Sequence, residues 1–511
     1  MKTYLLTFFM LVAFVSLNAQ NALYLHLDDT GTKISKEIYG HFSEHLGTCI
    51  YGGIYVGEDS DIPNVNGYRT DVVEALKEMK VPVLRWPGGC FADTYHWKDG
   101  IGPKEQRPSI VNVHWGGVTE DNSFGTHEFL NFCELIGTEP YLSINVGSGT
   151  VQEAAEWVEY VTSSNESPMT ELRKKNGRED PWDVKFWGIG NETWGCGGEM
   201  RPEYYADVYR QFAGYVRGRD FQRIACGPSG DDYNWTEKLM SGLRGKQWTV
   251  QGISLHYYTL PTGNWGSKGS STDFDEDMWF KTLRNTLKIE DYIQKHLAVM
   301  NQFDRDKRVK LLVDEWGTWY DPLPGTNPGF LQQQNTLRDA LVAGSNLNIF
   351  NTYADRISMA NIAQIVNVLQ SVILTNGKQM VKTPTYYVFK MFNVHHDAQL
   401  VPLDVACENY SYKGESLPAV NASASLKDGV LSITLCNLNP NKAVSVDCRF
   451  PGGNFASATG QIISAEKMND YNDFGKEEKV RTSEFKVKKP SNGALSVDLP
   501  AHSVVLVQLK P

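Results

Sequence analysis

Strand-like and helix-like patterns alternate along most of this 511-residue chain. Short apolar runs near residues 39, 83, 142, 187, 224, 254, 312 and 349 are separated by longer, mostly helix-like stretches, such as residues 69–79 and 278–303. Eight such alternations over about 350 residues are typical of a (β/α)8 barrel. We therefore predict an α/β fold with a TIM barrel over residues 38–385. Its active site is expected at the carboxyl ends of the strands.

After about residue 385 the pattern changes to short strand-like runs separated by Asn, Gly and Pro. Examples are residues 431–435, 444–448, 460–464 and 504–507. This pattern is typical of an all-β sandwich. We predict a C-terminal, jelly-roll-like sandwich over residues 386–511. Residues 20–37, which carry a strand-like run near Leu23 outside the barrel, are assigned to the same domain.

Composition narrows the class of partner. The formal net charge is −11, which makes nucleic acid an unfavourable partner. The eight cysteines form no Cys-x-x-Cys pair, so neither a zinc ribbon nor a small disulfide scaffold is indicated.

Residues 1–19 combine one cation, a short apolar run and a small-residue end, which is typical of a secretory signal peptide. A single membrane anchor is the alternative, but the run is shorter than the roughly 20 residues that a spanning helix needs. We therefore predict export across the inner membrane to a periplasmic or extracellular location, without a membrane partner.

Two predicted strands end in acidic residues. The run at residues 185–189 leads into Gly190-Asn191-Glu192, and the run at residues 309–313 leads into Asp314-Glu315-Trp316. By strand count these are the fourth and seventh strands, so Glu192 and Glu315 face each other across the barrel mouth. Either glutamate alone could form a salt bridge or a helix cap. Together, each flanked by Trp and Gly, they favour catalysis.

Two such carboxylates can flank a glycosidic bond, one protonating the leaving oxygen while the other attacks the anomeric carbon. A separation of about 5 Å would give retention of configuration. The neutral amide of Asn191 suits a hydrogen bond to a ring hydroxyl next to the reacting carbon.

These motifs resemble those of the retaining clan A glycoside hydrolases, and within the clan they are most similar to family 51 α-L-arabinofuranosidases. The resemblance covers nearly the whole chain after residue 19. It is carried by Gly40–Gly47, Leu84–Asp93, His96–Pro103, Gly190–Glu192, Ser254–Tyr258, Asp314–Trp316 and Ala360–Gln364.

The resemblance implies roles for nine residues. Glu192 would be the acid/base and Glu315 the nucleophile. Arg85 would help to keep Glu315 ionised, and Tyr258 would hold the nucleophile. The substrate-binding residues implied are Glu44, Arg85, Cys90, Asn191, His256, Tyr258 and Gln364.

Two positions depart from the family pattern. Cys90 stands where some relatives have Asn, and Thr48 where others have Arg. Cys90 and Cys196 are both expected in loops over the site. They could form a disulfide, or a reduced Cys90 could pack against the sugar.

The resemblance implies a retaining, exo-acting enzyme that releases terminal arabinofuranose from the non-reducing ends of arabinoxylan or arabinan side chains. Its partners would be arabinose-containing oligo- and polysaccharides. No cofactor or metal is expected, and a homo-oligomer, with a hexamer as one form, is implied.

Three alternatives stay open at this point. A related retaining glycosidase could cleave β-glucan or xylan with the same two glutamates. A non-catalytic sugar-binding module would not need them. The pattern His41-x-x-Glu44-His45 literally fits an inverted zinc protease motif, although its context favours a strand and loop rather than the helix that such a site requires.

Overall fold

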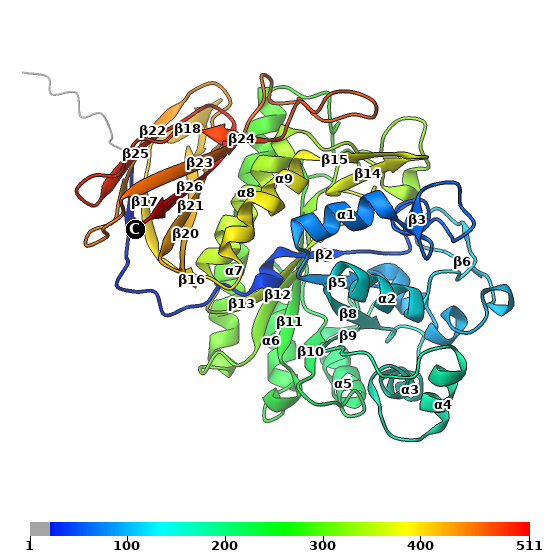
Figure 1. Ribbon diagram of the computed structural model, residues 1–511. Helices are drawn as coiled ribbons and strands as arrows, with labels where there is room; N and C mark the ends of the chain where they lie inside the picture. Colours follow the sequence, from blue (N-terminus) through cyan, green and yellow to red (C-terminus); the bar gives the residue numbers. More distant parts are fainter. Residues whose placement is uncertain (1–20) are drawn as a thin grey trace, which may run out of the picture.

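The computed structural model describes residues 21–511 and consists of a parallel β-barrel beside a β-sandwich (Figure 1). Eight strands close the barrel in the order in which they follow one another along the chain. This confirms the predicted fold class. The barrel strands are β2 (Gly40–Phe42), β5 (Val83–Trp86), β8 (Glu139–Ile144), β9 (Phe186–Ile189), β10 (Gln222–Ala225), β11 (Gly252–Thr259), β12 (Lys310–Thr318) and β13 (Ile357–Ala363).

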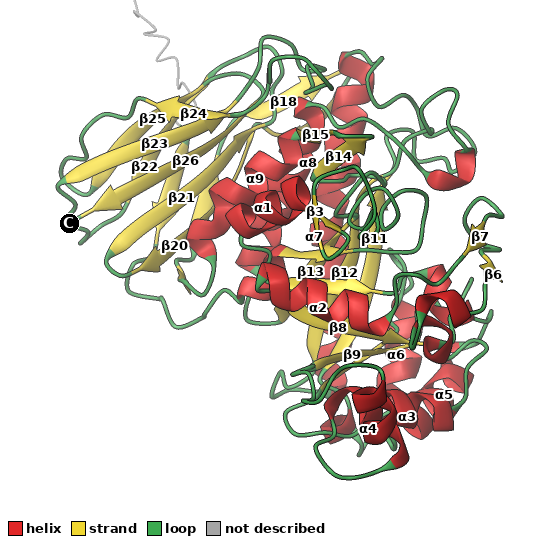
Figure 2. Ribbon diagram, turned by 45° about the vertical axis from the view of Figure 1, so that its right-hand side comes forward, coloured by secondary structure: helices red, strands yellow, loops and turns green. Residues whose placement is uncertain are grey.

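Helices surround the barrel because each parallel strand needs a crossover to reach the next one (Figure 2). Their apolar faces pack on the strands, as in α1, where Val72, Leu76 and Met79 are buried. The helices are α1 (Thr70–Met79), α2 (Thr126–Ile136), α3 (Val151–Thr162), α4 (Pro168–Lys175), α5 (Pro202–Ala213), α6 (Tyr233–Gly242), α7 (Glu276–Phe303), α8 (Leu337–Thr352) and α9 (Pro384–Phe392).

The eighth strand was wrongly placed by the sequence pattern. The run near residue 349, predicted as a strand, is the last part of α8, and the eighth strand is β13. Every residue of α8 from Leu337 to Asn351 is buried, because the helix lies between the barrel and the sandwich. A helix buried on all sides shows no polar stripe, so its apolar run cannot be distinguished from a buried strand by periodicity.

The sandwich consists of two sheets. The first contains β17 (Leu403–Ala406), β1 (Ala22–Leu25), β22 (Val444–Arg449) and β25 (Ala494–Leu499) in that order. The second contains β16 (Gln399–Leu400), β20 (Val420–Lys427), β21 (Val430–Asn437), β26 (Ser503–Lys510), β23 (Ser457–Ile463) and β24 (Thr482–Phe485). The N-terminal β1 pairs with β17 and β22. The predicted domain boundaries at residues 38 and 385 stay predictions.

Short hairpins extend some of the loops. They are β3 (Asn64–Val65) with β4 (Tyr68–Arg69), β6 (Ile110–Val111) with β7 (Thr119–Glu120), β14 (Ile373–Asn376) with β15 (Gln379–Lys382), and β18 (Asn409–Tyr412) with β19 (Glu415–Pro418). Among residues 21–511, we find no helix with the length and apolar character that crossing a membrane requires.

Helix α8 joins the barrel to the sandwich through buried polar contacts. The Asn348 side chain donates to Asn421 Oδ1 at 2.9 Å and accepts from the hydroxyls of Ser423 and Thr434 at 2.8 and 2.7 Å. On the barrel side, the Tyr39 hydroxyl donates to Asn351 at 2.8 Å. Because these buried groups are satisfied only when both parts are docked, the contacts fix how the sandwich sits on the barrel.

At Gly344, helix α8 packs closely against the sandwich. A Cβ atom at this position would lie 2.8 Å from Cys436 Sγ and 3.4 Å from a methyl group of Val504. We expect Gly344→Leu to lower the free energy of unfolding by about 1–3 kcal/mol or more through overpacking, measured by thermal or denaturant unfolding. Gly31→Leu is the matched control, because no atom lies within 4 Å of its added Cβ. Equal stability of the two variants would contradict the proposed close contact.

Candidate active site

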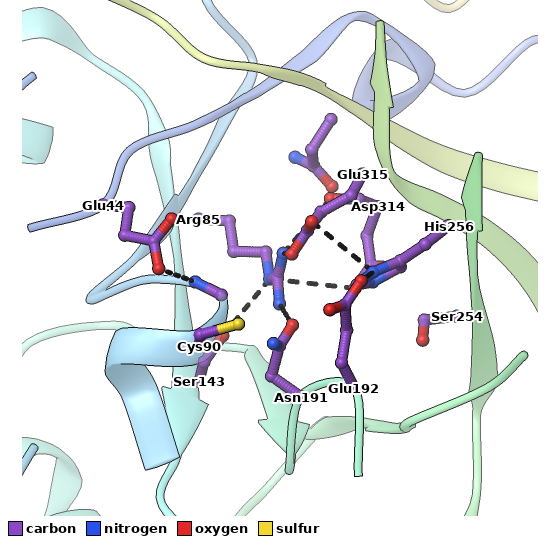
Figure 3. A network of polar contacts seen from close by, with 12 residues as sticks. Glu44, Arg85, Cys90, Ser143, Asn191, Glu192, Ser254, His256, Asp314 and Glu315 are labelled. Atoms are coloured by element: carbon purple, nitrogen blue, oxygen red, sulfur yellow. Dashed lines mark hydrogen bonds and ion pairs between the residues drawn. The ribbon is translucent and has the colours of Figure 1, made fainter. Parts of the chain in front are cut away.

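The two predicted glutamates lie side by side at the carboxyl ends of the barrel strands (Figure 3). Glu192 follows β9, and Glu315 is near the end of β12. His256, on β11, lies between them, with Nδ1 at 2.8 Å from Glu192 Oε1 and 3.5 Å from Glu315 Oε2. One oxygen of Glu192 and one of Glu315 lie within 4.8 Å of each other.

The loop after β9 turns sharply to present Glu192. Gly190 has a φ of 84°, and Glu192 itself has a φ of 40°, which non-glycine residues rarely adopt. The carboxylate of Asp93 accepts the backbone N–H groups of Asn191, Val146 and Gly147, at 3.2, 2.8 and 2.8 Å. Asp93 therefore ties the loops after β5, β8 and β9 together. Burial raises its pKa to about 7 despite these hydrogen bonds.

Glu315 is held from both sides. Arg85, on β5, donates from Nη1 to Glu315 Oε1 at 2.7 Å, and the Tyr258 hydroxyl donates to Oε2 at 2.9 Å. Arg85 Nη2 also donates to Asn191 Oδ1 at 2.6 Å. The Arg85 side chain is only 2% exposed, so its charge is compensated by protein groups rather than by water.

His256 connects Glu192 to a further buried acid, Asp314. Its Nε2 is 3.1 Å from Asp314 Oδ1, and the Tyr141 hydroxyl donates to Asp314 Oδ2 at 2.9 Å. Burial opposes the charged imidazolium, but the carboxylates of Glu315, Asp314 and Glu192 raise the pKa of His256 to about 10. With both ring nitrogens protonated, His256 donates from Nδ1 to Glu192 and forms an ion pair with Asp314 through Nε2.

The acidic groups around His256 are shifted in opposite directions. For Asp314, burial is outweighed by the Arg85 charge and the His256 hydrogen bond, so the pKa falls below the usual value. For Glu192, burial raises the pKa above its usual value, against the hydrogen bond from His256. Glu192 is thus the carboxyl group that is suited to hold a proton.

Glu44 lines the other side of the site. Its Oε1 accepts from the backbone N–H groups of Gly89 and Phe91 and from the indole of Trp115, at 3.0, 3.1 and 2.9 Å. Its Oε2 accepts from Gln364 Nε2 at 3.0 Å. Burial and the nearby charge of Glu315 raise the pKa of Glu44 to about 7.

A narrow pocket opens between these groups. The structure brings all nine residues predicted from the sequence together at or directly behind its wall. Three of the nine lie behind the wall and are linked to the lining residues by the hydrogen bonds described above: Arg85, Asn191 and His256. The residues that line the pocket are Glu44, Leu46, Gly89, Cys90, Trp115, Glu192, Tyr258, Glu315, Trp319, Leu331, Gln364 and Leu369.

Cys90 forms a disulfide with Cys196, with the two Cα atoms 5.5 Å apart. Of the two alternatives that the sequence left open, the disulfide is the one present. It joins the loop after β5 to the loop that carries Glu192, and Cys196 Sγ lies 3.7 Å from Glu192 Oε2.

Several site residues were not assigned a role from the sequence. Trp115 reaches Glu44 from the connection between β6 and β7, which carries no periodic signal. Asp93 and Asp314 lie in stretches that carry the family resemblance, and this was the only sequence feature that could have identified them as site residues. Tyr141 is the one aromatic residue of the buried strand β8, and a single aromatic residue in a buried strand reads as part of the core.

The zinc-protease pattern does not form a metal site. His41 lies on β2 rather than on a helix, its ring packs 4.6 Å from that of Phe389, and Glu44 points into the pocket instead. Within residues 21–511, two groups have metal-ligand spacing, and neither contains His41 or His45. In one of them the cysteines are bonded to each other, and in the other His256 is paired with both carboxylates.

A (β/α)8 barrel with two close carboxylates at the carboxyl ends of its fourth and seventh strands defines a glycoside hydrolase of the two-carboxylate class. Two family models match the chain, the "Alpha-L-arabinofuranosidase 1 domain" over residues 75–276 and the "Alpha-L-arabinofuranosidase C-terminal domain" over residues 314–503. The chain belongs to the family 51 α-L-arabinofuranosidases, as the relatives below also show.

An "Intracellular exo-alpha-L-arabinofuranosidase" of Bacteroides ovatus is 55% identical and covers 98% of each chain. "Alpha-L-arabinofuranosidase C" of Emericella nidulans is 33% identical over 98% of this chain and 100% of its own. The crystal structure of a family 51 arabinofuranosidase from Xanthomonas axonopodis pv. citri has a TM-score of 0.94 at 48% identity, covering 96% of this chain and 100% of that one. An arabinose complex from Thermotoga maritima has a TM-score of 0.84 at 30% identity, with the same coverage.

The predicted export is contradicted by these comparisons. The Bacteroides ovatus relative, which covers 98% of this chain, is named as intracellular. Residues 1–19, on which the signal-peptide prediction depends, lie outside the described residues. One cation before a short apolar run is a weak criterion, and we withdraw the prediction of a periplasmic or extracellular location.

The disulfide supports a prediction that does not depend on activity. We expect Cys196→Ser to lower the free energy of unfolding by about 2–4 kcal/mol, because Cys90 and Cys196 are far apart in the sequence. A reductant should lower the melting temperature of the wild type but not that of Cys196→Ser.

Cys407→Ser is the control for this prediction, because Cys407 is a free cysteine. It should keep the reductant sensitivity of the wild type. A wild type that melts at the same temperature with and without reductant would contradict a stabilising role of the disulfide.

Proposed function

We propose that this protein is an exo-acting α-L-arabinofuranosidase that releases terminal arabinofuranose from the non-reducing ends of arabinose-containing oligo- and polysaccharides. One observation carries the proposal. Glu192 and Glu315, with oxygens within 4.8 Å of each other, meet at a narrow pocket, where burial raises the pKa of Glu192 and Arg85 donates a hydrogen bond to Glu315. Family membership, and the names of the relatives, support the choice of sugar.

Glu315 is the proposed nucleophile. Arg85 and Tyr258 fix both of its oxygens, so that a carboxylate oxygen is aimed at the anomeric carbon with little loss of rotational freedom. The Arg85 charge stabilises this carboxylate before attack and the arginine stays in place when the glycosyl-enzyme forms.

Glu192 is the proposed acid/base. Its raised pKa keeps a proton available for the leaving oxygen, and after departure the same carboxylate can remove a proton from the attacking water. The short separation of the two carboxyl groups supports a double displacement with retention, because inverting enzymes need room for a water between them.

The polar groups of the pocket are proposed to bind the furanose hydroxyls. Glu44 and Gln364 are hydrogen-bonded to each other on one wall. Arg85 donates hydrogen bonds to both Asn191 and Glu315 and so connects the two side chains. The disulfide-bonded Cys90 contributes to the wall beside them and has no thiol to offer to the sugar. Arabinoxylan and arabinan side chains are the proposed natural substrates.

Other expectations rest on the sequence alone, either on its composition and pattern or on the family resemblance. The barrel boundaries, a homo-oligomeric state including a hexamer, the lack of a cofactor, and the lack of nucleic-acid and membrane partners stay predictions.

A screen with aryl glycosides tests the choice of sugar. We expect kcat/KM for the aryl α-L-arabinofuranoside to exceed that for the β-xyloside and β-glucoside by at least ~100-fold, because a site built to bind particular hydroxyls rejects sugars that leave its polar groups unpaired. A preference for glucose or xylose would overturn the substrate and favour a β-glucan- or xylan-cleaving relative.

Azide rescue tests the two roles. With a good leaving group, Glu192→Ala should accumulate a sugar adduct on Glu315, because the intermediate still needs base assistance to hydrolyse. Azide needs no base, and it should restore turnover and give an arabinosyl azide of retained configuration.

Glu315→Ala is the matched variant. It should form no adduct, and azide should give the inverted product. Peptide mapping that places the adduct on Glu192, or the opposite stereochemistry in the two variants, would show that the roles are reversed.

A further inference from the structure

A second, wider cleft adjoins the pocket and shares Glu192, Tyr258 and Trp319 with it. Its volume is about 520 Å³, which is within the range of sites that bind small molecules. Its walls come from the loops after β9, β10 and β12, from β11 and the loop after it, and from helix α7. The residues that line it are Glu192, Trp194, Ser229, Gly230, Asp231, Tyr257, Tyr258, Leu260, Gly263, Trp265, Asn285, Lys288, Tyr292 and Trp319.

A row of aromatic rings leads from the proposed nucleophile to the rim of this cleft. Tyr258, which donates to Glu315, packs edge-on against Trp319 with ring centres 4.9 Å apart. Trp319 in turn packs edge-on against Trp265 at 5.1 Å. Trp265 is 56% exposed, so the far end of the row presents a large aromatic surface to solvent.

The loop that carries Trp265 is anchored rather than free. Asp321 accepts the backbone N–H groups of Lys268 and Gly269 at 3.1 and 2.9 Å. Further along, the Arg338 guanidinium lies 3.7 Å from the centre of the Phe274 ring and donates to the Ser270 carbonyl. Trp265 is therefore held at the cleft before any ligand arrives, which reduces the entropy lost on binding.

The position of Glu192 indicates which part of the substrate the cleft would receive. The acid protonates the leaving oxygen, and Glu192 lines the side of the pocket that opens into the cleft. Glu44 and Gln364, which are proposed to bind the arabinose, line only the pocket. The cleft is thus on the side where the leaving part of the substrate emerges.

We propose that Trp265 is the stacking platform of a subsite for a main-chain sugar beyond the one that carries the arabinose. This inference rests on the proposed function and names its substrate class, an arabinose attached to a chain of at least two further sugars. Sugar rings present apolar C–H faces that pack on indole. Asp231 and Lys288 are exposed and line the cleft, where both can hydrogen-bond to the hydroxyls of such a chain.

The test compares Trp265→Ala with Trp248→Ala. Trp248 is similarly exposed, at 62%, but it lies in the segment Gln247–Thr249 that precedes β11, at the opposite end of the barrel from the cleft. The substrates are an aryl α-L-arabinofuranoside and xylo-oligosaccharides of two, three and four units that carry one arabinofuranosyl branch.

For each enzyme, the ratio of kcat/KM on the branched oligosaccharide to kcat/KM on the aryl glycoside is measured. In the wild type this ratio should rise with main-chain length. Trp265→Ala should lower it by roughly five- to tenfold on the longest substrate, as expected for loss of one stacking contact. Trp265→Phe should recover much of the loss, and Trp248→Ala should match the wild type.

A ratio that does not depend on chain length in the wild type would overturn the subsite while leaving the proposed function intact. The same holds if Trp248→Ala and Trp265→Ala lower the ratio equally. A wild type that is inactive on the aryl arabinofuranoside would overturn the proposed function and, with it, the subsite.

Discussion

The buried guanidinium of Arg85 is the group around which the active site is built. It reaches Glu315 and the Asp314 carbonyl on β12, Asn191 after β9 and Ser143 on β8, while it is itself part of β5. A cation buried in this way is stable only when its partners are in place, because an uncompensated buried charge is very costly. The barrel and the site therefore depend on each other: the strand ends bring the partners together, and Arg85 fixes their relative positions.

The charge balance around Arg85 also decides which glutamate holds a proton. Arg85 and the protonated His256 provide two positive charges, and Asp314 and Glu315, which contact both, provide two negative ones. The charge of a further ionised carboxylate at the same place would have no cation to balance it. In agreement with this, burial raises the pKa of both Glu192 and Glu44. The division of roles between two chemically identical side chains thus follows from their neighbours.

Local sequence patterns predicted the parts of the molecule that show hydrophobic periodicity or carry a sequence motif. Seven barrel strands were predicted because each is a short apolar run, and the position of both glutamates at the strand ends was predicted because distinctive residues follow two of these runs. The eighth strand was missed because the sequence of the fully buried helix α8 contains an apolar run like that of a buried strand. Trp115 and the pairing of Cys90 with Cys196 depend on loops that approach each other only after folding, and no local pattern encodes such proximity.

The shape of the site explains why an exo-acting enzyme can act on side chains of a long polymer. On the pocket side, Trp115 lies over Glu44, and Leu46, Leu331 and Leu369 form further walls, which leaves a narrow space beside Glu192 and Glu315. On the other side, the loops after β9, β10, β11 and β12 and helix α7 leave the wider cleft. In the proposed binding mode, a terminal sugar enters the pocket while the chain that carries it lies in the cleft. The backbone geometry after β9 positions Glu192 at the junction of the two spaces, which is where the proposed mechanism needs the proton of the acid.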